Sequence, residues 1–300
     1  MHTLIIANPI SGRGKALKYL NPVCSILETT ENHVETAVTG EAGDARRFAS
    51  EFKGELIVSF GGDGTFNEVL NGADLNRTML AVIPAGTGNV LAKELRIPLN
   101  PLKAAMAIKN GQEQRYDVGN ANGRLFAFAC GIGFDAHVIR HLHLDRSDNI
   151  SQTHYLPYFL KEALKPTKWG IRIEIDDRLY AENMNMVAVS NTESYGGPLV
   201  LTPNADPCDG RFAITALRMD TPLDILHPGL AALTRGLSRC NYSRNTRGAR
   251  IMVDARHPGT PFHVDGDYAG VLPLTVSIEP RRMRIVTVSE EHRRHRMLPT

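Results

Sequence analysis

A short apolar run that ends in a glycine-rich turn limits most strongly what this chain can fold into. Residues 56–60, Leu-Ile-Val-Ser-Phe, have the length and composition of a buried strand, and Gly-Gly-Asp-Gly follows at 61–64. The next residues, up to Gly72, are typical of a helix. Glycines let a backbone approach a ligand closely, and the N–H groups that open a helix attract anions. This turn predicts either a phosphate site or a tight connection capped by Thr65. The neighbouring segments of the sequence distinguish between these two interpretations.

Strand-like and helix-like segments alternate through the first third of the chain. The expected strands are 4–7, 34–39, 56–60 and 79–84, and the expected helices include those ending near Leu27, at 42–52 and at 102–109. Such alternation predicts an α/β fold with a doubly wound, mostly parallel sheet. Ligands of these sheets collect at the carboxyl ends of the strands.

Two further glycine-rich turns follow expected strands, at 8–16 and 85–92. The first lacks the Ser or Thr that a Walker loop requires after Lys15, so it is not that motif. Three such turns after successive strands would offer backbone N–H donors on the same side of the sheet. Together they predict a nucleotide-phosphate site.

From Gln114 onward, strand patterns follow one another without alternating helices. They cover 115–120, 125–130, 169–175, 184–190, 211–217, 250–253, 274–278 and 284–288. Asn122-Gly123 is a strong hairpin signal between the first two. We therefore predict an antiparallel β-sandwich at 114–300 after an α/β domain at 1–113, with the last residues free to return to the first domain.

Helical spacing interrupts the strands at 134–165, around a polar stretch at 146–153, and again at 223–237. The leucines of 223–237 indicate core packing more than a lipid-facing surface. A Gly-x-Gly-x-x-Ala sequence at 131–136 has the form of a dinucleotide fingerprint. Its strand belongs to the antiparallel series, so that interpretation is not favoured.

Composition excludes several classes of protein. The 300 residues are 42% hydrophobic and 22% charged, and the net charge of +2 gives no reason to expect nucleic-acid binding. The four cysteines are far apart, which indicates reduced thiols and a cytoplasmic compartment. The first residues lack the pattern of a signal peptide and no run of 18 apolar residues occurs, so we expect no cleaved leader and only peripheral membrane contact. A homodimer is compatible with the sequence.

Six motifs together resemble the diacylglycerol kinase catalytic family, which includes sphingosine kinases and bacterial lipid kinases. They lie at 8–15, 61–68, 84–89, 131–136, 189–191 and 264–267, over nearly the whole chain. The resemblance implies an N-terminal nucleotide domain, a C-terminal β-sandwich, and ATP with Mg²⁺ in the cleft between them. It also implies that ATP is held by Asn8, Ser11, Gly12, Thr39, Gly61, Gly62, Gly64, Thr65, Asn67, Glu68 and Thr87.

The resemblance also suggests catalytic residues. Asp63 would lie beside the reacting phosphate, and Asp265 and Asp267 match the family's Asp-Gly-Glu, which serves the metal and the proton transfer. Asp267 stands where glutamate is usual and is one methylene shorter, so the base is either Asp63 or Asp267. Asp135 matches an acidic position on the lipid side.

A structural Mg²⁺ is implied at the loop 206–211. There Asp209 would give a carboxylate, and Asp206 and Arg211 would give backbone carbonyls. The alternative is an ordinary Asp-Gly turn between strands.

The expected activity is that of an ATP-dependent lipid kinase, which transfers the γ-phosphate to a hydroxyl of diacylglycerol or a sphingoid base. Two alternatives stay open: a NAD kinase-like enzyme with a polar acceptor, and a non-catalytic sensor that binds ATP or lipid. The segment 223–237 and nearby arginines suggest contact with an anionic membrane surface.

Overall fold

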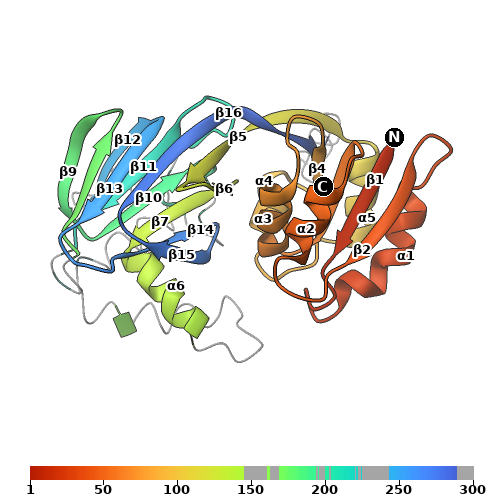
Figure 1. The fold of residues 1–300 in the computed structure, drawn as a ribbon, viewed down its shortest axis with the longest axis horizontal. Coiled ribbons are helices and arrows are strands. Elements are labelled where there is room, and N and C mark those ends of the chain that lie inside the picture. Colours follow the sequence, from red (N-terminus) through yellow and green to blue (C-terminus); the bar gives the residue numbers. More distant parts are fainter. Residues whose placement is uncertain are drawn as a thin grey trace, which may run out of the picture. The chain divides into compact units, whose positions relative to one another are not determined.

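The computed structural model describes residues 1–144, 161–162, 169–193, 195, 200–202, 204–219, 221, 224 and 243–288. The chain forms two compact units, one of Met1–Tyr116 with Arg281–Thr300 and one of Asp117–Pro280. It leaves the first unit along β5 (Gln112–Ala121) and returns along β16 (Leu274–Thr287) (Figure 1).

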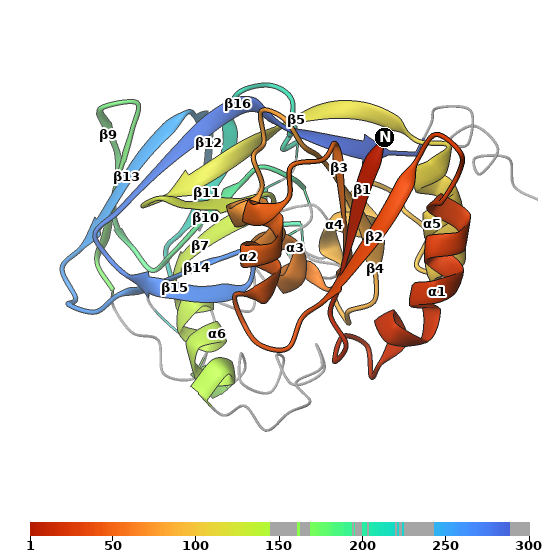
Figure 2. The ribbon, with the colours of Figure 1, turned by 45° about the vertical axis from the view of Figure 1, so that its right-hand side comes forward.

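The first unit is built on parallel strands with helices on both faces. The strands are β1 (His2–Ala7), β2 (His33–Val38), β3 (Leu56–Gly61) and β4 (Met79–Pro84), in the spatial order β2-β1-β3-β4. Helices α1 (Lys15–Leu27) and α5 (Pro101–Lys109) pack together on one face, and α2 (Asp44–Glu51) and α3 (Asp63–Gly72) on the other (Figure 2). Every residue of β3 is buried, which explains its continuous apolar run. The doubly wound fold is confirmed.

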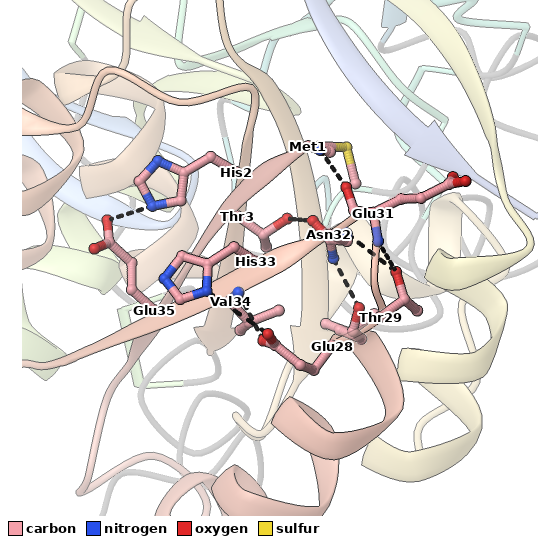
Figure 3. A network of polar contacts seen from close by, with 11 residues as sticks. Met1, His2, Thr3, Glu28, Thr29, Glu31, Asn32, His33, Val34 and Glu35 are labelled. Atoms are coloured by element: carbon pink, nitrogen blue, oxygen red, sulfur yellow. Dashed lines mark hydrogen bonds and ion pairs between the residues drawn. The ribbon is translucent and has the colours of Figure 1, made fainter.

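A polar network fixes the N-terminal ends of β1 and β2 (Figure 3). The hydroxyl of Thr3 donates to Oδ1 of Asn32 over 2.7 Å, and Nδ2 of Asn32 donates to the carbonyl of Leu27 over 2.7 Å. Thr3 and Asn32 are buried, so each needs these partners. The network holds the end of α1 beside the sheet.

The second unit is an antiparallel sandwich. One layer has the order β16-β13-β8-β9, and the other has the order β12-β11-β10-β7-β14-β15. The bounds are β6 (Arg124–Phe126), β7 (Ala129–Gly133), β8 (Ile171–Ile175), β9 (Arg178–Met184), β10 (Met186–Ser190), β11 (Phe212–Leu217), β12 (Ser243–Gly248), β13 (Arg250–Ala255), β14 (Pro261–Val264) and β15 (Asp267–Val271). Apolar side chains of both layers form its core, so the predicted sandwich is confirmed.

The hairpin between β5 and β6 is confirmed in its details. Asn122 and Gly123 have φ angles of 49° and 92°, the left-handed conformation that a two-residue hairpin turn requires. Three predicted strands differ from the structure. The run 125–130 divides into β6 and β7, and the segments 274–278 and 284–288 belong to the single strand β16.

Helix α6 (Phe134–Leu144) follows β7 and packs against β14 and β15 (Figures 1 and 2). The polar stretch 146–153 and the predicted helix 223–237 fall outside the described residues, apart from Asp224. Among the helices that the structure describes, none is long and apolar enough to cross a membrane.

Candidate functional site

The three glycine-rich turns of the first unit are in backbone contact with one another. A Cβ on Gly12 would lie 1.9 Å from the carbonyl oxygen of Ala85. A Cβ on Gly86 would lie 2.6 Å from the Cα of Gly62. The turns after β1 and β3 thus each touch the turn after β4, at distances that only glycine permits. The structure brings together the turns that the sequence predicts at one edge of the sheet.

Asn8 and Thr65 join the first of these turns to the second. Nδ2 of Asn8 donates to the hydroxyl of Thr65 over 3.1 Å, and Oδ1 of Asn8 accepts the N–H of Ile10 at 3.1 Å. The N-cap residue of α3 is Gly62, and no side chain caps it, so the interpretation of Thr65 as a helix cap is wrong. The buried Thr65 instead holds the β1 turn against the β3 turn.

Asp63 is the first residue of α3, and its carboxylate reaches the start of a second helix, α4 (Val90–Glu94). Oδ1 of Asp63 accepts the N–H of Leu91 at 3.2 Å. Burial raises the pKa of Asp63 above its ordinary value, although N–H groups at the start of α4 and the charge of Lys93 act in the opposite direction. The carboxylate thus links the turn after β3 to the start of α4.

The remaining residues predicted to hold ATP have varied surroundings. Thr39 and Asn67 are buried, whereas Gly12, Gly64 and Thr87 are exposed and Ser11 is half-buried. Glu68 accepts the N–H of Ala45 at 3.2 Å and so supports the first turn of α2. Their contacts to a nucleotide stay predictions.

In the second unit, Asp265 is engaged by the backbone. Its Oδ1 accepts the N–H groups of Phe128 and Ala129 at 2.9 and 3.1 Å, and its Oδ2 accepts that of Ala127 at 3.0 Å. These contacts bend the chain between β6 and β7, which explains why the run 125–130 forms two strands. Asp265 itself has a φ of 51°. The geometry favours a positioning role, and its predicted metal and catalytic roles stay predictions.

Asp267, two residues later, has a more open environment. Its side chain is 36% exposed, and Oδ2 lies 3.3 Å from a guanidinium nitrogen of Arg124. A partly exposed pair of this kind contributes little to stability, so the carboxylate remains accessible for chemistry. Sequence reasoning missed Arg124, because its contact with Asp267 spans 143 residues of the chain.

Asp135 forms a buried cluster with two residues that sequence reasoning also missed, His263 and Tyr195. Its Oδ2 lies 3.0 Å from Nε2 of His263 and accepts the hydroxyl of Tyr195, and that hydroxyl lies 3.2 Å from the same Nε2. A Cβ on Gly131 would approach all three polar atoms to within 2.1–2.2 Å. Gly131 therefore makes room for this cluster, and its place in β7 between antiparallel strands confirms that it is not a dinucleotide fingerprint.

The loop predicted to hold a structural Mg²⁺ is satisfied by the protein itself. Oδ1 of Asp209 accepts the N–H of Arg211 at 3.0 Å, and its Oδ2 lies 2.6 Å from Nη1 of Arg247. Oδ1 of Asp206 accepts the N–H of Cys208 at 2.9 Å. A cation here would have to share the Asp209 carboxylate with the guanidinium group of Arg247. The metal role of Asp206, Asp209 and Arg211 stays a prediction.

Asp117 is a fully buried acid that sequence reasoning missed. Its Oδ2 accepts the N–H of Gly210 at 2.7 Å, and its own N–H donates to the carbonyl of Pro207 at 2.6 Å. Nδ2 of Asn191 donates to the carbonyl of Asp117 at 2.8 Å and to that of Ala127 at 3.0 Å. Asp117 thus ties β5 to the loop 206–211. The sequence feature that could have revealed Asp117 is an acidic residue inside the predicted strand 115–120.

Comparison with known proteins matches both halves of the chain. A family model described as the diacylglycerol kinase catalytic domain matches residues 2–121. A second, described as the YegS C-terminal NAD kinase beta sandwich-like domain, matches residues 129–287.

Individual relatives are similar over most of their length. A diacylglycerol kinase of Bacillus subtilis is 33% identical over 280 residues, which cover 90% of each chain. A diacylglycerol kinase of Mycobacterium tuberculosis is 29% identical, over 94% of this chain and 93% of the relative. A crystal structure of a diacylglycerol kinase from Bacillus anthracis has the same fold, with a TM-score of 0.74 and 23% identity over 96% of this chain and 97% of the other. The chain therefore belongs to the diacylglycerol kinase catalytic-domain family.

Proposed function

We propose that this protein is an ATP-dependent lipid kinase, which transfers the γ-phosphate of ATP to a hydroxyl of a lipid such as diacylglycerol or a sphingoid base. One observation carries the proposal: three glycine turns, after three parallel strands, are in close backbone contact, and the Asp63 carboxylate of the second turn accepts the N–H of Leu91 in the helix after the third. Glycines let these turns pack closely against one another, and glycine-rich turns that open helices offer backbone N–H groups to a phosphate. The family relationship makes a lipid the favoured acceptor.

ATP and Mg²⁺ would supply the phosphoryl group and neutralise its charge. The protein's own residues would bind the phosphates, orient the acceptor hydroxyl and accept its proton. The turns at Gly12, Gly62 and Gly86 would bind the phosphates through backbone N–H groups, with Asn8 and Thr65 keeping the first two turns together. We assign proton removal from the acceptor hydroxyl to Asp63 or Asp267, and such removal contributes about 10²- to 10⁴-fold to rate.

The buried cluster of Asp135, His263 and Tyr195 would face the polar end of the lipid. A carboxylate that already accepts from a phenol and an imidazole presents a fixed polar surface, because its partners hold its orientation. We propose this cluster as the acceptor-binding part of the second unit, with Asp267 at the start of the neighbouring strand β15.

An acceptor panel tests the proposal. The protein is incubated with γ-labelled ATP and Mg²⁺ and offered diacylglycerol, phosphatidylglycerol, sphingosine, ceramide or NAD. Label in a lipid product is the expected result, and it would also name the lipid. Label in NAD alone would favour the NAD kinase-like alternative. ATP binding without transfer to any acceptor would favour a non-catalytic sensor.

A further inference from the structure

Two histidines and a glutamate form a cluster on helix α6 that the proposed kinase reaction does not use. His137 and His141 are four residues apart, so they project from the same face of the helix. Glu162 faces them from a segment later in the chain, with its Oε2 3.2 Å from Nε2 of His137. The ring centroids of the two histidines are 4.5 Å apart.

The spacing of these groups is close to that of a transition-metal site. One ligand atom from each residue can be chosen so that all three lie within 4.8 Å of one another. Metal bonds of about 2.0–2.1 Å at tetrahedral angles put neighbouring ligand atoms about 3.3 Å apart. The contact between His137 and Glu162 already has that length, and a ligand atom of His141 lies within 4.8 Å of both.

The surroundings suit a metal that prefers nitrogen ligands. The side chains of His137 and Glu162 are 23% and 18% exposed, so an ion could enter while most of the water is kept out. Arg140 also lies near, and its guanidinium is placed over the ring of Tyr268.

We propose that His137, His141 and Glu162 bind a divalent transition-metal ion of the Zn²⁺ class, with water in the fourth position. Two imidazoles and one carboxylate are a donor set that Zn²⁺ accepts and that Mg²⁺ does not favour. This site is therefore distinct in chemistry from any Mg²⁺ that accompanies ATP.

The site would link two distant parts of the chain. Helix α6 begins directly after β7 and carries Asp135 in its first turn. A metal that joins this helix to Glu162 would restrain the element on which the Asp135 cluster is built. Occupancy would then stabilise the second unit against unfolding, because the ion binds the folded arrangement of the three ligands.

The single tryptophan of the chain provides a local probe. The ring of Trp169 is 5.3 Å from that of His137, centroid to centroid, and it is buried. Co²⁺, whose visible absorption reports its coordination, is titrated into the full-length protein while the fluorescence of Trp169 is followed. We expect saturable quenching, tetrahedral Co²⁺ absorption, displacement of Co²⁺ by Zn²⁺, and no competition from Mg²⁺.

Two variants and one control localise the binding. His141→Ala removes one ligand and keeps both His137 and the Trp169 probe, and Glu162→Gln keeps a polar partner for His137 but removes the charge. Each should weaken Co²⁺ binding by at least about 10-fold, since even groups that only orient metal ligands contribute 10- to 100-fold. His33→Ala, an exposed histidine of the first unit, should change nothing.

Thermal unfolding is a second readout. Zn²⁺ should raise the Tm of the wild type and of His33→Ala, and should raise that of His141→Ala and Glu162→Gln much less. The proposal is wrong if the wild type shows no saturable quenching, or if both ligand variants titrate and respond to Zn²⁺ like the wild type. Kinase activity measured without added Zn²⁺ is expected to be the same in all four proteins.

Discussion

The backbone N–H of Leu91 donates to Oδ1 of Asp63 over 3.2 Å, so the acid of the second glycine turn also supports the first turn of α4. One carboxylate thereby joins the turns after β3 and β4. Its burial has an energetic cost, since burial raises the pKa of Asp63. A residue placed in this way contributes to a site at the expense of stability.

The first prediction concerns the pH dependence of stability. The folded-state pKa of Asp63 is raised, so its contribution to stability is fully present below its ordinary pKa, near 4, and is lost as the pH rises through the folded value. Asp63→Asn removes this loss and keeps an oxygen for Leu91. Urea unfolding at several pH values should show a stability advantage of the variant that grows above about pH 4. A stability advantage that is constant or falls with pH would contradict a raised pKa of Asp63 in the folded protein.

The second prediction concerns the contact between glycine turns. Gly12 and Gly14 both have left-handed φ angles, 58° and 85°, but a Cβ on Gly14 would meet nothing within 4 Å. Gly14→Ala should therefore cost only the left-handed strain, about 1–2 kcal/mol. Gly12→Ala should cost a further 1–3 kcal/mol or so from overpacking against Ala85, and should raise the KM for ATP. Urea unfolding measures the difference in stability between the two variants, and ATP kinetics measure the difference in KM. Equal effects would mean that the contact is unimportant.

The third prediction separates Asp265 from Asp267. Asp265→Ala leaves three backbone N–H groups without their acceptor, at about 1–3 kcal/mol for each group that stays unsatisfied, so it should unfold at much lower urea. Asp267→Ala should lose no more than about 1 kcal/mol of stability, because its ion pair with Arg124 is partly exposed.

Turnover then tests the assignment of the base. If Asp267 is the base, Asp267→Ala should lose about 10²- to 10⁴-fold in kcat while remaining folded. Normal turnover in Asp267→Ala leaves Asp63 as the base. Normal turnover in both Asp63→Ala and Asp267→Ala excludes the mechanism.

The fourth prediction concerns Gly131. Because a Cβ there would approach Asp135, His263 and Tyr195 to within 2.1–2.2 Å, Gly131→Ala should displace the cluster. The KM for the lipid acceptor should rise, and the KM for ATP should not. Gly123→Ala, at a hairpin turn of the same unit with open space around it, is the control. An unchanged lipid KM in Gly131→Ala would show that the cluster does not bind the acceptor.

Much of the fold could be predicted because buried parallel strands have a simple signature. The segment 56–60 is apolar throughout, since β3 is covered on both faces. Three of the strands that were missed, β9, β12 and β15, lie at sheet edges, whereas the short strand β14, which was also missed, lies between β7 and β15. An edge strand is exposed, so β12 (Ser-Arg-Asn-Thr-Arg-Gly) carries no apolar alternation that a sequence pattern could detect.

The candidate site likewise contains residues that the sequence could identify and residues that it could not. Asp63 and the glycine turns could be found because glycine spacing is local. Asp117 and His263 could not, since their partners Gly210 and Asp135 are 93 and 128 residues away. The partner of Glu162, His137, is 25 residues away, and nothing in the spacing of the two residues indicates a shared site. Such groups become neighbours only when the strands pair.

The most direct measurement compares initial rates of γ-phosphate transfer from ATP to diacylglycerol, phosphatidylglycerol, sphingosine and ceramide for the wild type, Asp63→Asn and Asp267→Asn, with folding of all three checked by urea unfolding. The account predicts transfer by the wild type to at least one of these lipids and a loss of about 10²- to 10⁴-fold in at least one folded variant. Equal rates in all three proteins, or ATP binding by the wild type with no labelled lipid, would contradict it.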